Sequence, residues 1–213
     1  MGAYPQVVDW NGDKKNDILC GDASGKVMVF INSGSAEKPV LAAAAPVLSA
    51  GKPIGSNGII YSKINFADYN GDGLRDLLMG HDSRRTSSQM VVYLNSGTAQ
   101  NPKLGAPQPI KLPGPRMRRP SPYLVDWDGD GKIDMLCGTD SDKVYWFRNT
   151  GSNKQPVHAA GVALKLIGPK KNYRCRLDVA DWNNDGKLDL LVGDFNSSAP
   201  RKSTGHIWLY LRK

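Results

Sequence analysis

The stretch Asp9–Leu19, DWNGDKKNDIL, places an aspartate or asparagine at its first, third, fifth and ninth positions: Asp9, Asn11, Asp13 and Asp17. Carboxylates held this close together repel one another unless a cation or bulk solvent compensates their charge. A bound metal ion is one interpretation of the stretch, and a solvated acidic turn is the other.

The pattern recurs three more times along the chain. Its further copies are DYNGDGLRDLL from Asp68, DWDGDGKIDML from Asp126 and DWNNDGKLDLL from Asp181, so the copies repeat every 55 to 59 residues. Self-similarity at such a period indicates repeated supersecondary units. An aromatic residue recurs with the acids at the second position (Trp10, Tyr69, Trp127, Trp182). Because a solvated turn has no reason to recur in register, we favour the metal interpretation.

The residue types of the loop select a hard divalent cation. In the pattern D-x-[DN]-x-D-G-x-x-D, positions one, three, five and nine offer side-chain oxygens, and position seven offers its backbone carbonyl. Oxygen ligands without His or Cys favour calcium or magnesium, and calcium tolerates an irregular cage better. We therefore predict up to four Ca²⁺ ions per chain. The predicted side-chain ligands are Asp9, Asn11, Asp13, Asp17, Asp68, Asn70, Asp72, Asp76, Asp126, Asp128, Asp130, Asp134, Asp181, Asn183, Asp185 and Asp189. The predicted carbonyl ligands belong to Lys15, Leu74, Lys132 and Lys187.

Glycine at position six permits the positive φ of a sharp turn, and three of the loops have it. The first loop has Lys14 there, so we expect its site to be the weakest. The loop is not an EF-hand, because position nine runs directly into a short apolar stretch that ends in glycine rather than into a helix. Short apolar stretches bounded by turn residues predict buried strands, so each metal loop should join two strands of a hairpin.

Each repeat continues with a β-branched and aromatic stretch, such as KVMVFINSG from Lys26, and three repeats add a weaker, Pro-containing segment. Pro in that segment suits an edge strand. Four strands per unit, repeated four times, predict an all-β fold of the β-propeller type.

The four loops and their trailing apolar stretches resemble FG-GAP/VCBS repeats, the calcium-bearing blades of integrin α-subunit heads and of many secreted bacterial proteins. The resemblance implies a calcium-binding β-propeller and an extracellular or secreted location. It says little about function, because propellers serve as lectins, lyases and adhesion modules alike. The departures from the pattern are Lys14 at position six and Asn184 at position four.

We expect a single propeller domain over residues 1–213, with blades at about 3–50, 58–112, 119–167 and 173–213. The last blade should lack its outer strand, so the four repeats form either a compact ring or part of a larger seven- or eight-bladed ring. Self-association through the open last blade is a further expectation, since an exposed strand edge invites pairing. No apolar stretch reaches the 18 residues of a membrane span.

The net charge of +8 is unevenly distributed, because most of the acidic residues lie in the four loops. The basic residues collect on the face that the loops between the second and third strands share with the connectors between blades, which predicts a site for an anionic polysaccharide or a protein ligand there. Nucleic acid is disfavoured, because no recognised module accompanies the charge. The predicted ligand-binding residues are Arg84, Arg85, Arg116, Arg118, Arg119, Lys170, Lys171, Arg174 and Arg176.

No catalytic motif is present, and the residues common to the repeats are metal ligands, glycines and core positions. We therefore favour a binding or scaffold protein and predict no catalytic residue. The alternative is a polysaccharide lyase, for which His81 and His206 with nearby tyrosines would supply a base.

Overall fold

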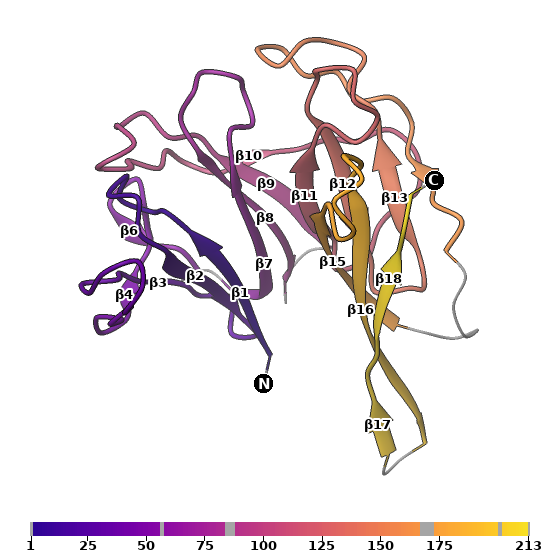
Figure 1. Ribbon diagram of the computed structural model, residues 1–213, viewed down its shortest axis with the longest axis horizontal. Coiled ribbons are helices and arrows are strands. Elements are labelled where there is room, and N and C mark those ends of the chain that lie inside the picture. The colour runs from indigo at the N-terminus through magenta and orange to yellow at the C-terminus, as the bar shows by residue number, and fades with distance from the viewer. Residues whose placement is uncertain (1, 56–57, 84–87, 167–172, 200–201, 213) are drawn as a thin grey trace. The chain divides into compact units, whose positions relative to one another are not determined.

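Strands and turns make up the chain (Figure 1). The computed structural model describes residues 2–55, 58–83, 88–166, 173–199 and 202–212, and these residues contain strands and no helix. None of them forms a helix long and apolar enough to cross a membrane. The chain divides into two compact units, Met1–Lys111 and Leu112–Lys213, which we describe separately.

The first unit holds two four-stranded antiparallel sheets, which correspond to the first two repeats. The first sheet consists of β1 (Ala3–Val8), β2 (Asp17–Asp22), β3 (Val27–Phe30) and β4 (Ala45–Pro46). The second consists of β7 (Ile59–Ala67), β8 (Asp76–Ser83), β9 (Gln89–Tyr93) and β10 (Gln108–Pro109). The hairpin of β5 (Leu48–Ser49) and β6 (Lys52–Pro53) lies between the two repeats and was not predicted.

The second unit repeats this arrangement. Its first sheet consists of β11 (Ser121–Val125), β12 (Asp134–Gly138), β13 (Val144–Phe147) and β14 (Val162–Ala163). Its second consists of β15 (Tyr173–Ala180), β16 (Asp189–Ala199) and β18 (Ile207–Tyr210), with β17 (Lys202–Thr204) pairing the far end of β16. Among the described residues no fourth strand pairs with β18, whereas β4, β10 and β14 close the other three sheets.

Each sheet is one predicted blade, and the strands follow one another across it in chain order. In every blade the metal loop connects the first strand to the second, as the register Val8↔Asp17 shows for the first repeat. The outer strands are only two residues long and contain Pro46 and Pro109 in the first unit. The predicted all-β, four-repeat β-propeller fold is therefore confirmed.

Glycine at the end of the second strand lets neighbouring blades approach closely within each unit. A Cβ atom on Gly21 would lie 2.0 Å from the carbonyl oxygen of Ser62, at the start of the next blade. In the second unit a Cβ atom on Gly138 would lie 2.3 Å from the carbonyl oxygen of Cys175. No side chain fits at these distances, so Gly21 and Gly138 serve the packing of one blade on the next within their units.

Each unit has its own apolar core between its two blades. In the first unit the core includes Leu19, Val27, Phe66 and Leu77, all 5 % exposed or less. In the second it includes Leu136, Val144, Leu190 and Val192, all 2 % exposed or less. The alternation of buried and half-buried residues along β2 and β3 places the core face on one side of the blade. The apolar stretches recognised in the sequence therefore form the inner strands.

Candidate metal centres and basic surface

Each metal loop is closed by the carboxylate at its first position. Asp9 accepts hydrogen bonds from the backbone N–H groups of Asp13 at 3.1 Å and Lys14 at 3.0 Å. The first aspartates of the other loops accept the equivalent pair of bonds, at 2.9 to 3.3 Å: Asp68 from Asp72 and Gly73, Asp126 from Asp130 and Gly131, Asp181 from Asp185 and Gly186. The four loops thus adopt one backbone conformation.

That conformation needs positive φ at two positions of every loop, four and six. At position six the values are 64° at Lys14, 87° at Gly73, 81° at Gly131 and 83° at Gly186. At position four they are 68° at Gly12, 65° at Gly71, 77° at Gly129 and 58° at Asn184. Lysine seldom adopts positive φ, so Lys14 adds about 1 kcal/mol of backbone strain to the first loop. Asparagine adopts positive φ more readily, so the fourth loop is little affected.

The carboxylate at position five points back into the loop. Asp72 accepts the N–H of Leu74 at 2.8 Å and the side-chain amide of Asn70 at 2.9 Å. Asp13 and Asp185 have the same two kinds of partner. The N–H of Lys187 and the amide of Asn183 hold the pKa of Asp185 below its ordinary value, so the group stays ionised.

The third loop differs because position three is Asp128, which has no amide to donate. The carboxylate oxygens of Asp126, Asp128 and Asp130 lie within 4.8 Å of one another. Oδ1 of Asp128 is buried and has no hydrogen-bond partner. A buried carboxylate oxygen without a donor is costly, and a cation among these oxygens would satisfy it. The donor set therefore fits a hard divalent cation.

The aspartate at position nine has a second role that the sequence did not reveal. Asp17 is fully buried; its Oδ2 accepts the N–H of Trp10 at 2.9 Å, and its Oδ1 accepts the N–H of Asn32 at 2.7 Å. Asp76, Asp134 and Asp189 make the equivalent pair of bonds. Burial raises the pKa of Asp76 and Asp134. The carboxylate thus joins the metal loop to the end of the third strand, whether or not it also binds a cation.

The Asn-Ser/Thr-Gly motifs after the third strand extend this connection. Asn32 is buried, and its Oδ1 accepts the N–H groups of Gly34 at 3.0 Å and Val40 at 2.9 Å. Asn95 and Asn149 bind the same two positions in their own repeats. The recurrence of this motif in three repeats could have indicated a structural role for the asparagine, but the motif itself predicted only a turn.

In two of the four loops a basic side chain of the protein pairs with the loop carboxylates. Nε of Arg148 lies 2.6 Å from Oδ2 of Asp128, and its Nη2 lies 3.0 Å from Oδ2 of Asp130. Nζ of Lys15 lies 3.0 Å from Oδ2 of Asp13 in the first loop. No ion pair to the carboxylates of the second or fourth loop is found among the described side chains.

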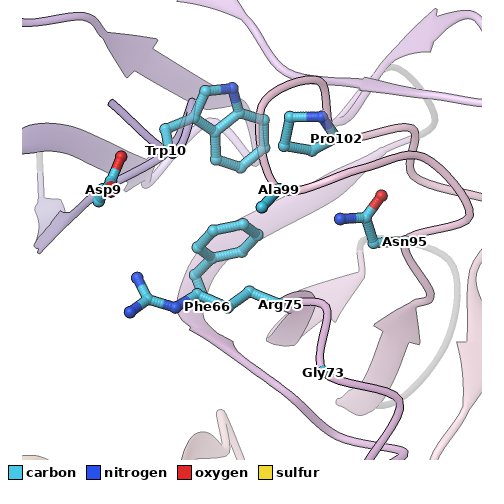
Figure 2. A pocket seen from close by; sticks show the side chains of 9 residues that line it. Asp9, Trp10, Phe66, Gly73, Arg75, Asn95, Ala99 and Pro102 are labelled. Carbon is cyan, nitrogen blue, oxygen red and sulfur yellow. The ribbon is translucent and has the colours of Figure 1, made fainter. Parts of the chain in front are cut away.

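In the first loop the aromatic residue at position two packs between the two blades of its unit. In the first unit the rings of Trp10 and Phe66 have centroids 4.8 Å apart, and Figure 2 shows them facing each other with Ala99 and Pro102 close by. The cavity beside them, lined also by Arg75, has a volume of about 170 Å³. Ligand pockets usually exceed about 300 Å³, so we assign it to blade packing.

The repeat pattern and the loop geometry now identify the family. A model of the FG-GAP-like repeat matches residues 9–79, 68–137 and 126–192. The chain belongs to the FG-GAP-like repeat family. Each match begins at one metal loop and ends in the second strand of the following blade, so it spans the loops whose geometry is given above. No curated protein matches the chain.

Two of the predicted ligand-binding residues of this FG-GAP protein, Arg119 and Arg174, pair with one carboxylate in the second unit. Nη1 of Arg119 and Nε of Arg174 both lie 3.6 Å from Oδ1 of Asp140, and the guanidinium of Arg174 lies over the ring of Phe195. The backbone carbonyl of Arg118 accepts the N–H of Asp140. Two arginines on one carboxylate leave a local excess of positive charge.

Of the other predicted ligand-binding residues, the structure describes Arg116, Arg118 and Arg176. Arg116 and Arg118 are exposed, and Arg176 donates to the carbonyl of Cys175. Arg84, Arg85, Lys170 and Lys171 lie outside the described residues. Arg119 and Arg174 have positive φ, 49° and 63°, as does Tyr61 at the same place in the second repeat, seven residues before the loop.

The two histidines considered as bases differ in exposure. His81 is 4 % exposed, and burial lowers its pKa, so it is a neutral core residue. His206 is half exposed, and its Nδ1 lies 3.3 Å from Oδ1 of the buried Asp194. Asp194 also accepts the indole N–H of Trp208 at 2.5 Å.

Proposed function

We propose that this FG-GAP protein is a calcium-stabilised binding or scaffold module whose loops each take one Ca²⁺ ion. A binding or scaffold role is what an FG-GAP propeller suggests in general. The observation that carries the calcium proposal is the third loop, where three carboxylates converge and one buried oxygen of Asp128 lacks any donor. The other three loops share its backbone conformation and its oxygen-only donor set.

Calcium would supply charge compensation rather than chemistry. Each loop holds three or four carboxylates, and their repulsion opposes the hairpin that the loop must close. The loop residues already orient the oxygens through backbone N–H bonds, so little rearrangement is needed on binding. The carbonyls of Lys15, Leu74, Lys132 and Lys187 remain predicted ligands.

An extracellular location follows from this proposal. Oxygen-only loops in extracellular modules bind calcium in the range of about 10⁻⁴–10⁻³ M. Calcium at millimolar concentration fills such sites, whereas the cytosolic concentration does not. The three cysteines are free, so they do not contradict or support secretion.

We propose that the partner is an anionic polysaccharide or an acidic protein segment, bound at the basic residues around Asp140. Arginine recognises carboxylates and sulfates through paired N–H groups. Arg116 and Arg118 add exposed positive charge in the stretch of chain directly before Arg119.

The test compares two charge reversals in the second unit. Arg118→Glu should reduce retention on a sulfated or uronic-acid polysaccharide column, and the reduction should shrink at high salt. Lys154→Glu is the control, because Lys154 is exposed on the Asn-Thr-Gly loop at the metal-loop end of the same blade. Equal losses in the two variants would show that retention reflects net charge and not this surface.

The lyase alternative rests on the pairing of His206 with Asp194. A buried carboxylate that orients a half-exposed imidazole is an arrangement suited to a general base. Incubation with polyuronates, followed by ultraviolet absorbance, would detect unsaturated products. Turnover that His206→Ala abolishes would establish the lyase, and binding without turnover would support the module.

A further inference from the structure

Arg148 is the one residue that pairs with two carboxylates of the same metal loop among the described side chains. Its guanidinium contacts Oδ2 of Asp128 at 2.6 Å and Oδ2 of Asp130 at 3.0 Å. Half of the arginine side chain is exposed. The guanidinium therefore sits where a divalent cation would need the same oxygens, yet it can leave toward solvent.

The position of Arg148 is apolar in the other repeats. It directly precedes the residue whose N–H binds the position-nine carboxylate, Asn149 in this blade. The corresponding residues are Ile31, Leu94 and Leu211. Nothing in the blade architecture requires an arginine there, so the charge is specific to the third loop.

Arg148 neutralises the negative charge of the third loop only in part. It pairs with Oδ2 of Asp128 but leaves the buried Oδ1 of the same carboxylate without a partner. A divalent ion would satisfy both the charge and this oxygen, whereas a guanidinium held on one side cannot. The loop therefore keeps an affinity for a cation while its own arginine opposes binding.

We propose that Arg148 is a built-in competitor that weakens cation binding at the third loop and replaces the cation when it is absent. The proposal rests on the function proposed above, because it assumes that the loops bind calcium. It reverses the order expected from the number of carboxylates, which would make the third loop the tightest site. It also predicts that the third loop stays closed at calcium concentrations that leave it empty.

The first loop shows a milder form of the same device. Nζ of Lys15 pairs with Asp13 and also donates to the carbonyls of Asn32 at 3.0 Å and Gly34 at 3.2 Å. Leu74 occupies the same position in the second loop. The ammonium is thus anchored to the third-strand end, and it neutralises one carboxylate and not two.

The decisive variant is Arg148→Leu, which installs the residue that the second and fourth repeats have. Terbium luminescence, excited through the tryptophan at position two, reports binding in the folded full chain, and calcium competition gives the affinity. Removing two ion pairs should tighten the third site roughly 3- to 10-fold. Adding Asp130→Asn should remove the tightened site and so assign it to this loop.

Lys154→Leu is the matched control, because it removes the same charge from an exposed position six residues away. It should leave the affinity of the third site within about 2-fold. Arg148→Lys keeps the positive charge but has one nitrogen in place of the two that contact Asp128 and Asp130. The affinity of this variant for the cation should therefore lie between those of the wild type and the leucine variant.

A second readout separates competition from a purely structural role. In chelator, Arg148→Leu should lower the melting temperature by roughly 2–4 °C, since two carboxylates lose their partner. In millimolar calcium the same variant should melt at or above the wild-type temperature. A structural arginine would lower the melting temperature in both.

The outcomes distinguish the two proposals. Unchanged cation affinity in Arg148→Leu, or tightening equal to that of Lys154→Leu, overturns the role of Arg148 and leaves calcium binding intact. Absence of any terbium or calcium binding, in the wild type and in Arg148→Leu, overturns the proposed function as well.

Discussion

The aspartate at position nine of each metal loop is less exposed than the aspartate at position five. Asp76 is fully buried, and its two oxygens accept the N–H groups of Tyr69 at 3.0 Å and Asn95 at 2.8 Å. Asp72, four residues earlier, is exposed and bonds only within its own loop. The carboxylate of Asp76 therefore stabilises the blade directly, and that of Asp72 should do so only if a cation is bound.

This difference predicts different calcium dependence for two neighbouring substitutions. Asp76→Ala leaves two N–H groups without an acceptor and should cost about 2–5 kcal/mol of unfolding free energy, in chelator as well as in calcium. Asp72→Ala should be nearly neutral in chelator and destabilising in calcium. Denaturant unfolding under both conditions measures the two costs, and equal calcium dependence of both variants would refute the distinction.

The three cysteines should differ in reactivity. Cys137 and Cys175 are buried, 0 % and 3 % exposed, while Cys20 is half-buried. Burial raises the pKa of the Cys175 thiol to about 11, so almost no thiolate forms near neutral pH. A thiol reagent at pH 8 should label Cys20 in the native protein and the other two only after unfolding. Rapid labelling of all three would show that the blades open readily.

At the scale of the element, the strand-two glycine decides how closely blades pack. A Cβ atom on Gly138 would lie 2.3 Å from the carbonyl oxygen of Cys175, whereas the nearest atom to a Cβ on Gly193 is the carbonyl oxygen of Arg176, 4.0 Å away. The two glycines occupy the same place in successive repeats, so they form a matched pair.

Gly138→Ala should therefore destabilise the second unit by about 1–3 kcal/mol through overpacking. Gly193→Ala should change the unfolding free energy little, because the added methyl group would lie at an ordinary van der Waals distance from its nearest neighbour. Thermal unfolding of the two variants gives the comparison. Equal stabilities would mean that the blades separate without cost to accommodate a methyl group.

The sequence predicted the elements well where repetition supplied the signal. The metal loop, the two strands that flank it and the third strand recur in register, so their order and the hairpin followed from four aligned copies. Lys14 at position six, with φ of 64°, adopts the conformation that glycine predicted in its sister loops. The outer strands were placed from their prolines alone and proved to be only two residues long.

Other features could not be predicted because they depend on contacts between distant residues. Arg148 lies 18 residues from Asp130, and its apolar counterparts gave no reason to pair it with the loop. Asp140 was not recognised as the carboxylate between Arg119 and Arg174, because it comes from a different blade than Arg174. Whether the position-nine aspartates also bind a cation stays a prediction, as do the ligand roles of the position-seven carbonyls.

At the scale of the whole molecule, calcium should provide much of the stability. A ligand that binds only the folded state stabilises it by RT ln(1 + [L]/Kd). With Kd near 10⁻⁴ M and calcium near 10⁻³ M, each loop contributes about 1.4 kcal/mol, and four loops about 6 kcal/mol. Internal cations at the first and third loops reduce the dependence of those loops on calcium.

Chelation should accordingly lower the melting temperature by roughly 10–25 °C. Thermal unfolding in chelator and in millimolar calcium, with polysaccharide retention measured below both transitions, checks this expectation. Magnesium at the same concentration should restore less of the stability, because it demands a more regular cage. An unchanged melting temperature with lost retention would place calcium at the recognition surface instead.

The decisive measurement for the four repeated loops is the number of calcium ions bound per chain. The protein is dialysed into millimolar calcium, and elemental analysis gives the calcium bound per chain above the dialysate. With one ion per loop, the value should approach four equivalents, fall by one in Asp72→Ala and stay unchanged in Lys154→Leu. One equivalent or none would contradict the assignment of the four repeated loops as calcium sites.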